Sequence, residues 1–212
     1  MHNLALHQET YEANPNENEQ HIAPSAKVHP SCILEGPITI EEDVEVGPLC
    51  FLRGPLTIGA GTIIRDSCSI GSDGLFTKPV SGRYEQIRHY GGVQVGKNCQ
   101  IYSGSRIAKS AIFQSVTLLE DEVSVGEQCV IGHDSHIATR TTIAAAASIL
   151  GRVSVEPDCW IGAGSLISNS CRIGHNSSVK AGAVVIQDLE PDSIVSGNFA
   201  QPHHRTLRDL LK

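Results

Sequence analysis

Residues 125–160 read VGEQCV IGHDSH IATRTT IAAAAS ILGRVS VEPDCW, six hexads that each begin with an aliphatic residue. The spacing extends outward in two runs, from residue 22 to 70 and from residue 95 to 185, and Phe113 is the fourth member of the second run. A period of six fits neither a helix nor a plain strand, so the chain must turn a corner once per hexad. Hexapeptide repeats of this kind predict an all-β parallel β-helix, in which three hexads make one triangular turn.

The cysteines share one phase of this repeat. Each stands two residues before an in-phase aliphatic position, where the side chain points inward and must be small: Cys32, Cys50, Cys68, Cys99, Cys129, Cys159 and Cys171. Thr62, Ala111, Ser135 and Ala147 occupy the same position in other hexads. Free cysteine behaves as a small hydrophobe, so we predict packing rather than disulfides or metal binding.

Composition restricts the possible functions. A chain of 212 residues fits one domain, and its net charge of −7 gives no electrostatic reason to bind nucleic acid or an anionic membrane surface. The sequence contains no apolar stretch long enough to span a bilayer and no evident signal peptide. We therefore expect a cytoplasmic protein without a transmembrane segment, and the odd number of cysteines agrees with that compartment.

The period divides the chain into three parts. We expect a polar N-terminal arm over residues 1–20, the β-helix over 21–188, and a C-terminal tail with a short amphipathic capping helix over 189–212. The register breaks within 21–188 at a loop of residues 71–92, which is aromatic and locally basic. Long loops inside compact repeats are more often functional, although a plain surface excursion stays open as an alternative.

One histidine stands out by its position. His133 follows an in-phase residue by two, which places it on the outer wall beside a corner, and Asp134 could orient its imidazole. Such a pair suits general-base catalysis. Gly151 lies 18 residues further on, one full turn higher, where its backbone N–H could stabilise an oxyanion. The spacing alone is equally compatible with a surface histidine that has no catalytic role.

Several segments resemble a known family. IGHDSHIA (131–138), SGNFAQP (196–202) and IGSDGLF followed by HYGGVQVG (70–76 and 89–96) resemble segments of the left-handed β-helix hexapeptide acyltransferases, most closely those that acylate UDP-sugars in lipid A synthesis. The resemblance implies a left-handed coil, a homotrimer with active sites between neighbouring prisms, and a nucleotide-linked sugar as substrate. It also implies acyl-CoA or an acyl-acyl carrier protein as co-substrate, with no permanently bound cofactor.

The resemblance also implies roles for individual residues. His133 would be the base, Asp134 its partner and Gly151 the oxyanion donor. Substrate-binding residues would be Asp73, Phe76, Arg88, His89, Tyr90 and His136. Residues 158–185 are also similar to the pantetheine groove of acetyl-CoA-dependent sugar acetyltransferases, and the implied donor-binding residues are Arg152, Ala163, Lys180 and Ala181.

The sequence departs from the lipid A enzymes in two places. Only about 20 polar residues precede the coils, where the amine-acylating enzyme carries a uridine-recognition domain, and its acidic–Arg–Gly segment is replaced by AKS at 108–110. These departures favour a related enzyme that acylates the amine or hydroxyl of another sugar.

Three alternatives remain. The first is an acetyl-CoA-dependent sugar N- or O-acetyltransferase of surface polysaccharide synthesis. The second is a zinc hydrase of the γ-carbonic anhydrase type, but it needs a histidine five residues after the first, and residue 138 is alanine, so we predict no metal site. The third is a non-catalytic β-helix scaffold.

Overall fold

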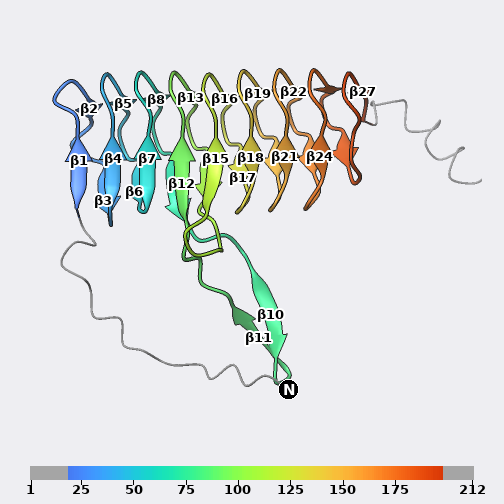
Figure 1. Ribbon diagram of the computed structural model, residues 1–212, viewed down its shortest axis with the longest axis horizontal. Coiled ribbons are helices and arrows are strands. Elements are labelled where there is room, and N and C mark those ends of the chain that lie inside the picture. Colours follow the sequence, from blue (N-terminus) through green and yellow to red (C-terminus); the bar gives the residue numbers. More distant parts are fainter. Residues whose placement is uncertain (1–18, 198–212) are drawn as a thin grey trace, which may run out of the picture.

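The computed structural model describes residues 19–197, which form three parallel sheets wound into one β-helix (Figure 1). The coils stack along the long axis of the molecule from the blue N-terminal end to the red C-terminal end. Each coil contributes one short strand to each sheet, as the six-residue period predicts.

The strands are bounded as follows. Sheet A contains β1 (Gln20–Ile22), β4 (Ile38–Ile40), β7 (Leu56–Ile58), β12 (Gly92–Val95), β15 (Val116–Leu119), β18 (His136–Ile137), β21 (Ser154–Val155) and β24 (Arg172–Ile173). Sheet B contains β2 (Lys27–Val28), β5 (Glu45–Val46), β8 (Ile63–Ile64), β13 (Gln100–Ile101), β16 (Ser124–Val125), β19 (Thr142–Ile143), β22 (Trp160–Ile161), β25 (Ser178–Val179) and β27 (Ile194–Val195). Sheet C contains β3 (Ile33–Glu35), β6 (Phe51–Arg53), β9 (Ser69–Ser72), β14 (Arg106–Ala108), β17 (Val130–Ile131), β20 (Ser148–Ile149), β23 (Leu166–Ile167) and β26 (Val184–Val185).

Most in-phase residues form the core, whereas Ile22 in the first coil is 41% exposed. Ile131 pairs with Ile149 one coil above and both are fully buried, and the same holds for Ile137 and Val155 in the next sheet. Because side chains alternate along a strand, the residue before each of these faces outward. The result is a narrow apolar column surrounded by a largely polar outer wall.

The cysteines pack into this column. All seven are free, six are buried, and Cys32 is half-buried. Six of the seven thiols, all except that of Cys171, donate a hydrogen bond to a backbone carbonyl, as Cys129 Sγ does to Ala144 O at 3.1 Å. The predicted packing role is confirmed for these side chains.

The expected loop contains an antiparallel hairpin. Strands β10 (Thr77–Val80) and β11 (Arg83–Gln86) pair and project sideways from the stack (Figure 1). Ile58 stacks on Val95, 37 residues later, whereas an uninterrupted coil takes 18, so the loop adds 37 − 18 = 19 residues.

A second insertion lies one coil above and was not expected. Val95 stacks on Leu119, 24 residues later, which is six more than one coil. The extra residues lie between β14 and β15, in the segment 109–115, and Phe113 is 71% exposed. The assignment of Phe113 and Ala111 to the wall was therefore wrong. An insertion of one whole hexad keeps the phase of the repeat, so the period alone does not reveal it.

The coils continue beyond the boundary expected at residue 188. Strand β27 pairs with β25, although its residues belong to the segment assigned to the tail. The expected capping helix and most of the N-terminal arm lie outside the described residues. Within residues 19–197 no helix is long and apolar enough to cross a membrane.

Candidate active site

Both insertions and the candidate catalytic residues lie along one edge of the prism. This edge, here called the C–A corner, consists of the turns that connect each strand of sheet C to the next strand of sheet A. The loop 71–92 follows β9, the insertion 109–115 follows β14, His133 follows β17, and Gly151 follows β20. Four successive coils therefore bring these segments into one column.

His133 and Asp134 form a hydrogen-bonded pair. The imidazole Nδ1 lies 2.6 Å from Asp134 Oδ2, and the His133 side chain is 13% exposed. With the carboxylate ionised, Nδ1 carries the proton and donates a hydrogen bond to Asp134 Oδ2, which leaves the lone pair on Nε2. Asp134 turns the corner at a φ of 60°, so its carboxylate folds back toward the imidazole. The contact that the sequence suggested is present, and the orienting role of Asp134 stays a prediction.

Three further residues form hydrogen bonds with Asp134, and sequence reasoning missed all three. Ser110 Oγ donates a hydrogen bond to Asp134 Oδ1, and the Ala111 N–H donates to Oδ2 at 3.4 Å. The Asp134 N–H donates to Thr117 Oγ1 at 2.9 Å. Ser110 and Ala111 belong to the second insertion. The only signal in the sequence was the unusual AKS segment at 108–110.

These contacts decide the charge of Asp134. Burial raises the pKa of its carboxyl, but hydrogen bonds from Ser110, His133 and the Ala111 N–H lower it by more. The net pKa lies below its usual value, so the carboxylate is ionised at neutral pH. An ionised Asp134 keeps the proton of His133 on Nδ1.

Gly151 packs directly against the imidazole. A Cβ built on Gly151 would lie 2.8 Å from His133 Nε2 and 3.0 Å from Cε1, which no real Cβ tolerates. Among the hydrogen bonds of residues 19–197, the Gly151 N–H has no acceptor. The absence of a side chain therefore makes room for the ring and leaves an unused donor on the adjacent coil, as the 18-residue spacing predicts.

The loop contributes two rings that contact His133. The Phe76 ring stacks on the imidazole with centroids 5.2 Å apart and an interplanar angle of 18°. The His89 ring meets it edge-on, also at 5.2 Å. His89 is only 3% exposed, and its Nδ1 lies 3.2 Å from the Ile87 carbonyl. Burial lowers the pKa of His89.

The Nε2 atoms of His89 and His133 differ in solvent exposure. His89 Nε2 is the one buried side-chain nitrogen or oxygen in residues 19–197 without a hydrogen-bond partner. His133 Nε2 also makes no hydrogen bond to a described residue, yet it is not among the fully buried atoms. A ligand can therefore reach His133 Nε2, as a general base requires.

The other expected substrate-binding residues lie farther from the imidazole. Asp73 Oδ1 lies 3.4 Å from Lys109 Nζ, so the loop is tied to the second insertion. Arg88 and Tyr90 line an open groove on the N-terminal side of the loop. His136 stands on the outer face of sheet A, where its Nε2 lies 2.7 Å from Glu120 Oε1, and it has no contact with the His133 ring.

The expected donor-binding residues divide between two edges. Arg152 adjoins Gly151 at the C–A corner, and its Nε donates to Ser170 Oγ at 3.3 Å. The others lie at the turns that connect sheet B to sheet C, the B–C corner: Ala163, Lys180 and Ala181. One strand of sheet C separates these turns from the C–A corner, so a single chain does not bring them to His133.

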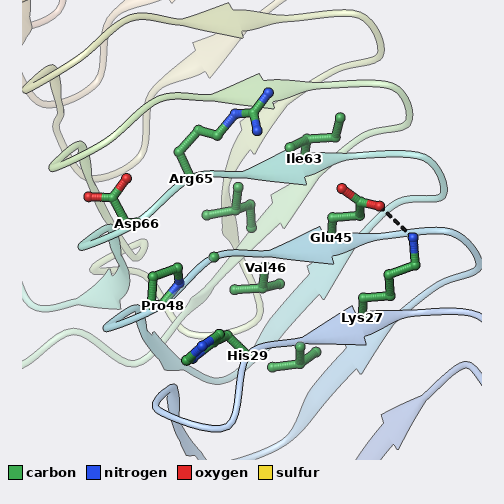
Figure 2. A pocket seen from close by; sticks show the side chains of 11 residues that line it. Lys27, His29, Glu45, Val46, Pro48, Ile63, Arg65 and Asp66 are labelled. Carbon is green, nitrogen blue, oxygen red and sulfur yellow. Dashed lines mark hydrogen bonds and ion pairs between the residues drawn. The ribbon is translucent and has the colours of Figure 1, made fainter.

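A second hollow lies far from His133. It occupies about 420 Å³ at strands β2, β5 and β8, beside the ion pair in which Lys27 Nζ lies 2.7 Å from Glu45 Oε1 (Figure 2). None of the expected site residues lines it. Across residues 19–197 no group of three or more His, Cys, Asp or Glu side chains is arranged to hold a metal ion.

Comparisons with known proteins establish the fold. Residues 152–187 match the family model described as bacterial transferase hexapeptide (six repeats). Solved structures of UDP-N-acetylglucosamine acyltransferases are similar over most of the chain. The chain is a left-handed parallel β-helix.

Two of these structures show how far the likeness extends. The Bacteroides fragilis acyltransferase has a TM-score of 0.61 at 18% identity, covering 89% of this chain and 77% of its own. The Acinetobacter baumannii enzyme has a TM-score of 0.59 at 20% identity, with the same coverage. No curated protein matches the sequence. The shared left-handed β-helix spans the C–A corner described above.

Proposed function

We propose that this protein is an acyltransferase that moves an acyl group from a pantetheine thioester to an amine or hydroxyl of a nucleotide-linked sugar. The observation that carries the proposal is His133, whose Nδ1 is bound to Asp134 while Nε2 remains accessible beside Gly151. A positioned base next to an unused backbone donor is the minimum arrangement for acyl transfer.

The reaction follows from this geometry. His133 Nε2 removes a proton from the acceptor nitrogen or oxygen, which attacks the thioester carbonyl carbon. The carbonyl oxygen of the tetrahedral intermediate accepts a hydrogen bond from the Gly151 N–H. The intermediate collapses as its carbon–sulfur bond breaks, and the imidazolium returns the proton to the leaving thiolate. Asp134 stabilises the imidazolium between these steps.

The acceptor class is proposed from the comparisons. Similar solved structures, that from Bacteroides fragilis among them, are described as acyltransferases of UDP-N-acetylglucosamine, a nucleotide-linked sugar. The donor would be acyl-CoA or an acyl-acyl carrier protein, which share the pantetheine thioester, and the carrier protein would then be a transient partner. Free buried cysteines agree with the reducing cytoplasm as the compartment.

A homotrimer would complete the site. Lys180 and Ala163 lie at the B–C corner, away from His133 in the same chain. Cyclic packing of three prisms would place that corner of one copy beside the C–A corner of the next. Donor-binding and catalytic residues would then come from neighbouring subunits.

The chain offers a closely matched control for the catalytic histidine. His175 occupies the same place in its hexad as His133, and Asn176 after it adopts a left-handed φ of 55°, as Asp134 does. No side-chain hydrogen bond involves the exposed His175 ring among the described residues. The IGHD and IGHN segments share their hexad phase, but His175 is exposed and lies between β24 and β25, at a turn from sheet A to sheet B rather than at the C–A corner.

The proposal is tested by screening acyl-CoA and acyl-carrier-protein donors, acetyl-CoA included, against nucleotide amino sugars by mass spectrometry. A positioned base contributes about 10²–10⁴ in rate, so His133→Ala should lose at least 100-fold in turnover with the best pair. His175→Ala should retain the wild-type rate. A His133→Ala variant that keeps more than a tenth of the rate would refute the assignment.

A further inference from the structure

The groove on the N-terminal side of the loop encloses about 1060 Å³, larger than inorganic phosphate or a simple sugar requires. It runs along the same C–A corner as His133, over the first coils. We infer that this groove binds the nucleoside diphosphate part of the acceptor. The inference rests on the proposed function and adds the place and chemistry of nucleotide recognition.

Two Gly-Pro turns form part of the floor of the groove. The first two C–A turns are Gly36-Pro37 and Gly54-Pro55, where later coils carry projecting pairs such as His133-Asp134. A Cβ on Gly54 would lie 2.1 Å from the Pro37 carbonyl oxygen, so no other residue fits there. The loop overhangs this flat floor and forms one end of the groove.

The charges in the groove leave one cation unpaired. Arg53 donates to Glu35 Oε2 through Nε at 3.0 Å and Nη2 at 2.8 Å, and Lys109 pairs with Asp73. The remaining charged group is Arg88, whose guanidinium forms no ion pair or hydrogen bond with any residue in 19–197. An unpaired arginine in a protein with a net charge of −7 is suited to bind a diphosphate.

Two aromatic rings complete the recognition surface. Tyr90, at the end of the loop, is 61% exposed, and Phe113, in the second insertion, is the exposed ring described above. Exposed aromatic faces beside an arginine are typical platforms for a nucleic-acid base. A base stacked on these rings would leave its diphosphate near Arg88.

His89 connects the groove to the catalytic centre. Its side chain lines the groove, and its ring lies against His133. A nucleotide held in the groove would therefore direct its sugar to the base.

The test is calorimetric titration of the full-length protein with UDP, dTDP, GDP and ADP, and with inorganic pyrophosphate. At least one nucleoside diphosphate should bind at least 10-fold more tightly than pyrophosphate. Arg88→Gln and Tyr90→Ala should each weaken that binding at least 10-fold. The controls are Arg83→Gln and Tyr84→Ala, exposed residues of the hairpin outside the groove, which should bind as the wild type does.

Binding and catalysis are separated by His133→Ala, which should bind the nucleotide unchanged. Equal affinity in the groove variants and their controls would overturn the inference. So would absence of nucleotide binding in a preparation that acylates free amino sugars, and only the acyl-transfer part of the proposed function would then stand. Nucleotide binding in the groove by a protein inactive with every donor would instead support the groove and count against acyl transfer.

Discussion

Ser110 donates a hydrogen bond to Asp134 on the adjacent coil. Ser110 belongs to an insertion that lies outside the repeating wall. The dyad therefore depends on a segment that is 24 residues distant in sequence. Because the same carboxylate accepts from His133, we propose that Ser110 acts on His133 through Asp134 as a positioning residue.

Substituting Ser110 should reduce catalysis more than stability. A hydrogen bond to a charged group contributes about 1.5–3 kcal/mol, so Ser110→Ala should lower kcat by about 10-fold or more and raise the pKa of Asp134. Ser110→Thr keeps the hydroxyl and should stay within a few-fold of the wild type. The measurements are kcat as a function of pH and thermal unfolding. Equal activity of the Ala and Thr variants would show that the bond has no catalytic role.

Two glycines beside His133 should respond differently to alanine. The Cβ of Gly151→Ala overlaps Nε2 at 2.8 Å, whereas the Cβ of Gly74→Ala meets Cδ2 at an ordinary 3.5 Å. Gly151→Ala should displace the imidazole and reduce kcat at least 100-fold, with little change in melting temperature because the ring can move. Gly74→Ala should remain near wild-type activity. Comparable activity in the two variants would contradict the close packing of Gly151 and His133.

The loop should loosen in acid. Burial lowers the pKa of His89 although Asp73 and Asp134 raise it, so the docked ring is neutral and protonation favours the undocked state. The contribution of His89 to docking is complete above its unfolded pKa of about 6.5 and decreases as pH falls from there through the folded pKa. Hydrogen exchange of residues 77–86, corrected for intrinsic rates, should accelerate between pH 7.5 and 5. His89→Phe should abolish most of that acceleration, and an unchanged pH response would exclude His89 as its source.

The cysteines should be inert in the folded protein. Burial raises the pKa of the Cys99, Cys129 and Cys159 thiols, and the thiolate is the reactive form. Titration with Ellman's reagent should modify at most the half-buried Cys32 under native conditions and all seven after denaturation. Rapid native modification of several thiols would contradict the packing of the column.

The sequence predicts the wall well because the inward-facing residues of the coils recur every six positions. The phase places Ile131, Ile149 and the cysteines correctly, and it stacks Gly151 on His133. It fails at Phe113 because six added residues restore the phase after the insertion. A count of in-phase residues therefore cannot distinguish a wall hexad from one that bulges outward.

The partners of the dyad could not be predicted for a related reason. Segments 71–92 and 109–115 have no repeat, so nothing in their spacing says that His89 packs on His133 or that Ser110 reaches Asp134. Those contacts depend on how two insertions fold against each other at the corner, where Asp73 meets Lys109. The period determines which coils lie adjacent but not how the insertions fold.

The insertion within 109–115 adds six residues, one whole hexad, to its coil. Because the addition equals one full repeat unit, every later coil, including the one that carries His133, keeps the same hexad phase. A β-helix of this kind can therefore gain or lose a whole hexad at a corner without changing which residues of the other coils face inward. Ser110 and Ala111, which contact Asp134 of the proposed dyad, thus lie on an insertion that can change without altering the phase of the coils.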